Sequence, residues 1–125
     1  PLQNITAGEI LAADMGNEPG NVLFPQSAAR MIRDQLRDLP GVKVTVLDEK
    51  KMRQQNMNAA LAVGQGSANP PCMVVIEYDG TKGKQAGWPL ALVGKGVTFD
   101  TGGIWIKPAS GMPEMKMDMC GAAAV

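Results

Sequence analysis

The sequence has 125 residues, with 12 basic and 12 acidic side chains and therefore no formal net charge. This length suits one small domain with a single hydrophobic core, and the balanced charge gives no support for a nucleic-acid partner or a polybasic membrane patch. No apolar run approaches the ~20 residues that a transmembrane helix needs, and the N-terminus lacks the basic start and apolar stretch of a signal peptide.

The first predicted element is a short helix that Thr6 can cap and that continues to about Met15. The Asn, Gly and Pro residues of the segment 16–21 then predict a turn. Glu18 and the asparagines of this segment are interpreted as turn formers rather than as a functional cluster.

A second helix and a strand follow. Pro25 suits the first position of a helix, whose apolar residues recur at helical spacing as far as Leu39 before Pro40 ends it. The sequence "VKVTVL", residues 42–47, alternates as a half-buried strand does, and Asp48 is a plausible cap for a third helix.

The remaining pattern predicts a loop at 64–71, a buried strand "CMVVIEY" at 72–78, a long polar turn at 79–89 and another buried strand "LALVG" at 90–94. Helices that alternate with apolar strands indicate an α/β fold, in which a mixed sheet is flanked by helices in three layers, α/β/α. The segment after 90–94 would then lie beyond the C-terminal end of a core strand, where ligands usually bind.

Cysteine and histidine usage limits the chemistry. Cys72 and Cys120 show no CxxC spacing, so neither a disulfide scaffold nor a zinc–thiolate site is expected, and the environment is predicted to be reducing and cytoplasmic. The chain has no histidine, which excludes histidine-dependent nucleophiles within it. A metal site must therefore use carboxylates, carbonyls, water or lysine, which suits Mg²⁺ or Mn²⁺ and can still hold Zn²⁺.

Two glycine-rich segments fail as nucleotide-binding motifs. The segment "GKGVT", 94–98, lacks the P-loop spacing that puts lysine directly before serine or threonine, and "GQGSAN", 64–69, lacks the third glycine of a dinucleotide fingerprint. Charged side chains in the run "LVGKGVTFDTGGIWIKP", 92–108, therefore need another interpretation. Taken singly, such residues are more often solvated surface groups than ligands.

The segment "VGKGVTFDTGG…K…EMKMDMCGAAAV", together with "GNEPGNVLFP", "VLDEK" and "LAVGQGSANPP", resembles the leucyl aminopeptidase family of dinuclear metallopeptidases. The resemblance implies that Lys95, Asp100 and Asp118 are metal ligands, that Lys107 is the catalytic lysine that stabilises the developing oxyanion, and that Met115 contributes to the wall of the substrate pocket with Asp100 and Lys107. It implies two divalent ions per site, Mn²⁺ or Zn²⁺ with Mg²⁺ as a further option.

The residue types suit these implied roles. A lysine amine ligates a metal only after it has lost its proton, so Lys95 would be neutral while Lys107 stays charged. Metal ions can lower the pKa of water to about 7 and so supply a nucleophile at neutral pH. A positive charge on Lys107 would then stabilise the negative oxygen of the tetrahedral intermediate.

The resemblance further implies release of N-terminal, preferably leucine-like, residues from peptides by a cytoplasmic enzyme that assembles as a homohexamer. The NTDAEGR-like segment that completes the family's site does not occur in the sequence, and "DMCGAAAV" ends as the first turn of a helix. Residues 1–125 are therefore expected to be the first part of the catalytic domain, without the N-terminal regulatory domain and the C-terminal remainder.

Two residues depart from the family pattern, namely Cys120, where the family usually has glycine, and Trp105, where it usually has a small or aliphatic residue. Two alternatives to a working enzyme stay open at this stage. One is a non-catalytic fragment or pseudoenzyme with half of the metal site. The other is a DNA-binding relative, which the balanced charge does not favour.

Overall fold

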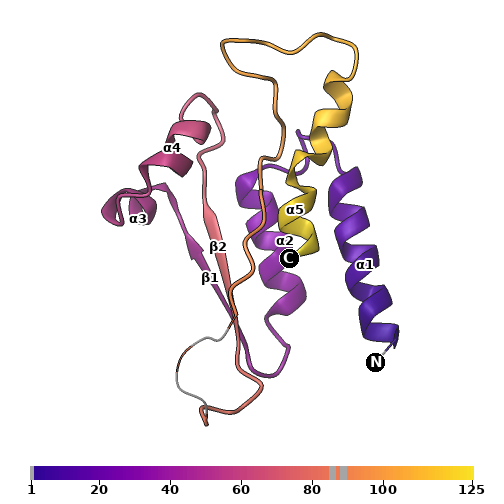
Figure 1. Ribbon diagram of the computed structural model, residues 1–125, viewed down its shortest axis with the longest axis vertical. Helices are drawn as coiled ribbons and strands as arrows, with labels where there is room; N and C mark the ends of the chain where they lie inside the picture. Colours follow the sequence, from indigo (N-terminus) through magenta and orange to yellow (C-terminus); the bar gives the residue numbers. More distant parts are fainter. Residues whose placement is uncertain (1, 85–86, 88–89) are drawn as a thin grey trace. The chain divides into compact units, whose positions relative to one another are not determined.

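The computed structural model describes residues 2–84, 87 and 90–125 (Figure 1). The chain divides into two compact units, one made of residues 1–24 and 91–125 and the other of residues 25–90. Each unit contains its own buried side chains, so each is described by itself.

The unit 25–90 is built around two strands. Strands β1 (Val42–Leu47) and β2 (Met73–Tyr78) pair in antiparallel register, with Val42 opposite Tyr78 and Leu47 opposite Met73. Helices α2 (Pro25–Leu36) and α3 (Glu49–Gln54) pack against β1, and α3 contacts α4 (Asn58–Gly64), as Figure 1 shows.

Three predicted features of this unit are confirmed. Helix α2 begins at Pro25, strand β1 covers the predicted residues, and Asp48 caps α3 by accepting a hydrogen bond from the Lys51 amide at 2.8 Å. Helix α2 ends at Leu36, before the predicted limit at Leu39, and the chain then turns through Gly41 (φ +77°), where a Cβ would lie 2.6 Å from the Asp79 carbonyl oxygen.

The α/β class is confirmed, because helices flank the sheet, but the sheet is smaller than expected. Within the described residues it has two antiparallel strands, and residues 90–94 are not a strand as the sequence predicted. A strand requires a neighbour for its N–H and C=O groups, and none of the described residues pairs with this segment. Its side chains are correspondingly exposed, Val93 to 93%. The polar turn predicted at 79–89 falls partly on residues 85–86 and 88–89, which lie outside the described residues.

The other unit consists of three helices and the glycine-rich loop. Helix α1 (Leu2–Asn17) packs against the 3₁₀-helix η1 (Met112–Met119) and the short helix α5 (Cys120–Ala124). Met15, Leu23 and Met119 form its buried core. Figure 1 shows α1 beside η1 and α5.

Two sequence-based expectations about this unit need correction. Thr6 lies inside α1 and does not cap it, because the preceding residues continue the helix and a capping side chain is only a weak signal against helix propagation. The turn predicted from residue 16 begins later, since α1 runs to Asn17. In the described part of the chain, no helix combines the length and apolarity needed to cross a membrane.

Candidate metal centre

Gly94 allows the loop that carries Lys95 to lie against helix α5. A Cβ on Gly94 would lie 2.4 Å from the Gly121 carbonyl oxygen and 2.5 Å from the Cα of Ala122, so only glycine permits this approach. The Ala122 amide donates a hydrogen bond of 2.8 Å to the Lys95 carbonyl oxygen. The backbone at Lys95 is thereby fixed beside the junction of η1 and α5.

This placement brings Lys95 to Asp118, the last but one residue of η1. Lys95 Nζ lies 3.5 Å from Asp118 Oδ2, an ion pair without a hydrogen bond. Asp118 Oδ2 is buried and has no hydrogen-bond partner among the described residues. A buried carboxylate oxygen without a partner is costly, which indicates that this oxygen is arranged for another ligand.

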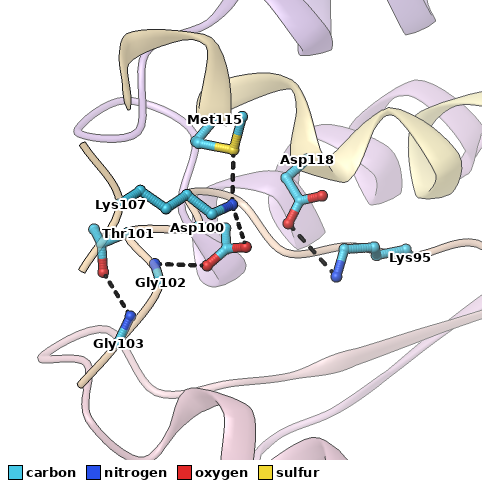
Figure 2. A network of polar contacts seen from close by, with 8 residues as sticks. All are labelled: Lys95, Asp100, Thr101, Gly102, Gly103, Lys107, Met115 and Asp118. Carbon is cyan, nitrogen blue, oxygen red and sulfur yellow. Dashed lines mark hydrogen bonds and ion pairs between the residues drawn. The ribbon is translucent and has the colours of Figure 1, made fainter. Parts of the chain in front are cut away.

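The second pair joins Lys107 to Asp100. Lys107 Nζ donates to Asp100 Oδ2 at 2.7 Å and also contacts the Met115 sulfur at 2.9 Å (Figure 2). The Lys107 ammonium first, and then the Gly102 amide that donates to Asp100 Oδ1 at 2.9 Å, hold the pKa of Asp100 below its ordinary value. Asp100 is therefore ionised at neutral pH.

The backbone between these two residues forms a closed loop. Lys107 N donates to the Thr101 carbonyl oxygen at 2.9 Å, and the chain turns through Gly102 and Gly103, whose φ angles are +91° and +69°. A Cβ on Gly102 would lie 2.3 Å from the Trp105 carbonyl oxygen. The turn at "TGG" thus brings the chain back, so that Lys107 contacts Asp100 although seven positions separate them in the sequence. The positioning roles of Gly94 and Gly102 were not predicted, although a Gly-Gly pair that begins two residues after the candidate ligand Asp100 is the signal that could have suggested the second.

Figure 2 shows both lysine–aspartate pairs and Met115 in one view. The positive charge of Lys95 also contributes to the lowered pKa of Asp100, so the two pairs act on each other electrostatically. All five residues that the sequence singled out therefore gather in one unit, as two pairs with Met115 against one of them. Their roles stay predictions.

The donors fit one part of a metal site. A lysine amine and two carboxylates are donors that a divalent ion accepts, and one of these carboxylates has a buried oxygen with no hydrogen-bond partner among the described residues. The described residues include no group of three or more His, Cys, Asp and Glu side chains that could hold a metal ion. These residues suit a site to which other residues also contribute.

The unit 25–90 contains a separate groove of about 420 Å³, and none of the predicted site residues lines it. Cys72 lies at this groove, where its thiol donates to the Pro25 carbonyl oxygen at 3.2 Å and burial raises its pKa. A raised pKa disfavours the thiolate, which agrees with the interpretation of Cys72 as a small, unreactive side chain.

Lysine and aspartate pairs beside a glycine-rich loop on an α/β fold suit a metal-dependent hydrolase. A family model described as the cytosol aminopeptidase family, catalytic domain, matches residues 10–125. The chain belongs to the cytosol aminopeptidase family.

Individual relatives agree with this membership. The chain is 53% identical to a probable cytosol aminopeptidase of Acinetobacter baylyi, over 99% of the chain and 25% of the relative. It is 51% identical to a cytosol aminopeptidase of Pseudomonas aeruginosa, over 98% of the chain and 24% of the relative. The chain therefore spans about a quarter of the length of these curated relatives.

Solved structures are similar over the same extent. The bottromycin maturation enzyme BotP in complex with Mn superposes with a TM-score of 0.79 at 37% identity, covering 95% of this chain and 25% of that one. The cytosol aminopeptidase of Coxiella burnetii has a TM-score of 0.76 at 32% identity, covering 90% of this chain and 23% of that one.

Proposed function

We propose that these residues form part of the catalytic domain of a metal-dependent aminopeptidase that removes N-terminal residues from peptides. The observation that carries the proposal is the pair Lys95–Asp118, in which a buried carboxylate oxygen that has no hydrogen-bond partner in the described part of the chain faces an amine 3.5 Å away. Membership of the cytosol aminopeptidase family supports the same activity.

Lys95, Asp100 and Asp118 would hold the metal ions. Asp118 offers its buried Oδ2, and Asp100 offers a carboxylate that its neighbours keep ionised. When bound, divalent ions lower the pKa of water and so supply a nucleophile at neutral pH. Two ions are proposed, with Mn²⁺ or Zn²⁺ preferred and Mg²⁺ as a further option, and residues outside this chain would complete their coordination. The Mn complex of BotP supports the choice of manganese.

Lys107 is the proposed catalytic residue. Its ammonium lies at the end of a closed loop, against Asp100 and Met115, and can place positive charge where the peptide carbonyl oxygen becomes negative. Met115, with Asp100 and Lys107, would line the pocket for the first side chain of the substrate. The half-buried thioether suits an apolar, leucine-like side chain.

The domain organisation, the cellular compartment and the assembly are proposed by analogy with the family. Residues 1–125 would be the first part of the catalytic domain, in an enzyme that also has a regulatory domain before it and the remainder of the catalytic domain after it. The enzyme would act in the cytoplasm as a homohexamer on peptide substrates. Relatives named cytosol aminopeptidase support the compartment.

The first experiment measures the intact mass, the metal content and the hydrolysis of leucine amide by the protein that carries this chain. About two metal ions per chain and turnover that a chelator removes and Mn²⁺ or Zn²⁺ restores are expected. The same measurements on Asp118→Ala and Asp100→Ala variants should show metal affinity lowered by at least about tenfold.

The matched control is Asp38→Ala, because Asp38 is an exposed carboxylate in the other unit and pairs with the neighbouring Arg37. Its metal content should equal that of the unaltered protein. Unchanged metal content in both Asp100→Ala and Asp118→Ala would refute the proposed ligands. A protein that binds no metal and hydrolyses no leucine amide would be a pseudoenzyme.

A further inference from the structure

Lys116 connects η1 to the end of helix α1. Its Nζ donates a hydrogen bond of 2.8 Å to the Asn17 carbonyl oxygen, although 99 positions separate the two residues in the sequence. Asn17 is the last residue of α1, and carbonyl groups at a helix C-terminus have no partner within the helix and carry partial negative charge. An ammonium group is favourable at this place. Lys116 therefore ties η1 to a fixed point on α1.

Two faces of η1 have different partners. In a 3₁₀-helix, which has three residues per turn, side chains three positions apart lie one above the other. Met115 and Asp118 therefore share one face, and Lys116 and Met119 share another. The first face meets the site, because the Met115 sulfur and the Asp118 carboxylate contact the two site lysines at 2.9 and 3.5 Å (Figure 2). The second face meets the α1 side, through the Lys116 hydrogen bond and the buried Met119.

The rotation of η1 about its own axis thus determines where Met115 and Asp118 point. Eight residues is long for a 3₁₀-helix, whose hydrogen-bond geometry is poor, so the backbone of η1 resists such a rotation only weakly. Contacts to α1 must supply the resistance. Met119 contributes an unbranched side chain that adapts to its surroundings, whereas Lys116 makes a hydrogen bond to one backbone atom. The orientation of η1 therefore depends on Lys116 in particular.

We propose that Lys116 is a positioning residue of the candidate metal site. By bonding to the C-terminus of α1 it fixes the rotation of η1, and so orients Asp118 as a metal ligand and Met115 as the wall of the pocket for the first side chain of the substrate. This inference rests on the proposed function. Because one contact orients two side chains, its loss should weaken metal binding and the preference for a leucine-like side chain together.

The test is Lys116→Met in the protein that carries this chain, a variant that keeps much of the length of the side chain and removes the donor. Calorimetry with Mn²⁺ on the metal-free protein should show about tenfold weaker binding, as when a group that orients a metal ligand is lost. At saturating Mn²⁺, the ratio of kcat/KM for leucine amide to that for alanine amide should fall about threefold. Lys116→Arg keeps a donor for the carbonyl oxygen and should keep both values within about twofold of the unaltered protein.

Lys43→Met is the matched control. Lys43 Nζ pairs with Glu77 Oε2 at 2.8 Å in the other unit, so this variant loses a lysine contact of the same length away from the site. Its Mn²⁺ binding and its substrate ratio should equal those of the unaltered protein. In urea, the metal-free Lys116→Met and Lys43→Met proteins should unfold at similar midpoints, because a single lysine contact at the surface contributes little to stability.

Unchanged Mn²⁺ binding in Lys116→Met, or a substrate ratio that does not fall with it, would overturn the inference. A urea midpoint far below that of Lys43→Met would also overturn it, because the contact would then hold the fold and not the ligand. Weaker Mn²⁺ binding in Lys116→Met, with no hydrolysis of either amide by any of the proteins, would refute the proposed function and leave the positioning of Asp118 standing. An unaltered protein that binds no Mn²⁺ would refute both.

Discussion

The two lysines of the candidate site have different surroundings, and this difference suits their proposed roles. Lys107 donates to Asp100 and contacts the Met115 sulfur, and its side chain is 35% exposed. Lys95 is 60% exposed and approaches Asp118 without a hydrogen bond. Lys107 thus makes a charge-assisted hydrogen bond that Lys95 does not make with Asp118. This contrast fits the proposed roles of Lys95 as a metal ligand and of Lys107 as the catalytic lysine.

A substitution of Lys107 tests this assignment. Lys107→Met keeps much of the length of the side chain and removes the charge, so kcat for leucine amide should fall by about 10²–10³ with little change in KM, as when one oxyanion donor is lost. Steady-state kinetics on the metal-loaded protein measure both constants. Lys84→Met, an exposed lysine of the other unit, is the control and should keep the activity of the unaltered protein. A rise in KM alone would show that Lys107 binds substrate without stabilising the transition state.

At the scale of elements, the close crossing of the loop over α5 depends on the absence of a side chain. Gly94→Ala would place a Cβ 2.4 Å from a backbone oxygen, and neither backbone segment can move without breaking the bond from Ala122 N to the Lys95 carbonyl. The free energy of unfolding should fall by about 2 kcal/mol. Urea denaturation followed by circular dichroism measures the change.

Gly96→Ala is the matched control for that prediction. A Cβ on Gly96 would lie 3.5 Å from the Ala122 Cβ, an ordinary van der Waals contact. Its unfolding free energy should equal or slightly exceed that of the unaltered protein, because alanine restricts the unfolded chain. Equal destabilisation by Gly94→Ala and Gly96→Ala would mean that the close approach of the loop to α5 at Gly94 does not require glycine.

The turn after β2 is held by one carboxylate. Asp79 Oδ1 accepts from the Thr81 hydroxyl at 2.6 Å and the Thr81 amide at 2.8 Å, and Oδ2 accepts from the Gly83 amide at 2.7 Å. These hydrogen bonds, the Thr81 hydroxyl first, lower the pKa of Asp79 from its ordinary value of 3.8. A lowered pKa in the folded state stabilises the fold above the unfolded pKa, and the contribution is lost as the pH falls through the folded value.

Stability measured against pH tests this turn. The difference in unfolding free energy between the unaltered protein and Asp79→Ala should be constant near neutral pH and should shrink below about pH 4. Urea titrations at successive pH values measure it, and Asp14→Ala, an exposed carboxylate on α1, should show no such trend. A difference that grows on acidification would have the wrong sign for a lowered pKa.

Local signals explain what the sequence predicted at this scale. Pro25 and Asp48 act through their own backbone neighbours, and β1 shows its alternation within six residues, so all three were predictable. The segment 90–94 looks like a buried strand because its composition is apolar, but pairing depends on residues distant in the sequence. The eight-residue 3₁₀-helix η1 was not predicted either, since its weak periodicity resembles irregular structure.

At the scale of the whole molecule, apolar side chains are exposed in both units. Ile76 and Tyr78 on β2 are 42% and 65% exposed, and Ile104 and Trp105 are exposed on the glycine-rich loop. A two-stranded sheet is marginally stable by itself. The chain spans about a quarter of the length of its relatives, and we propose that the sheet face is covered in the longer protein.

Assembly is predicted at the same scale. We expect light scattering of the protein that carries this chain to give the mass of a homohexamer that persists on dilution to the nanomolar range used in assays. The exposed apolar side chains of the sheet give a physical reason for this surface to be buried against another part of the protein or another subunit. A monomer mass with full turnover would contradict the proposed assembly and leave the proposed chemistry intact.

The sequence predicted which residues gather at the candidate site and not how they pair. The glycine frame singled out Lys95, Asp100, Lys107 and Asp118, whose roles stay predictions. Sequence spacing does not show that Lys107 contacts Asp100 or that Asp118 Oδ2 has no hydrogen-bond partner among the described residues. Those facts depend on how the loop crosses α5 and on how "TGG" turns the chain. Side-chain pairing across a fold is a property of the backbone path, which no local pattern encodes.

The hydrogen bond from the Ala122 amide to the Lys95 carbonyl also allows local opening of the site to be measured by hydrogen exchange. The Ala122 amide hydrogen can exchange with deuterium only when the Lys95 carbonyl has moved away, so its exchange rate reports how often the segment that carries Lys95 leaves helix α5. The amide of Lys107, bonded to Thr101, reports in the same way on the loop that holds the other lysine. The exchange rates of these two amide hydrogens thus report local opening at the two halves of the site. Mass spectrometry measures both rates without substrate, metal or turnover.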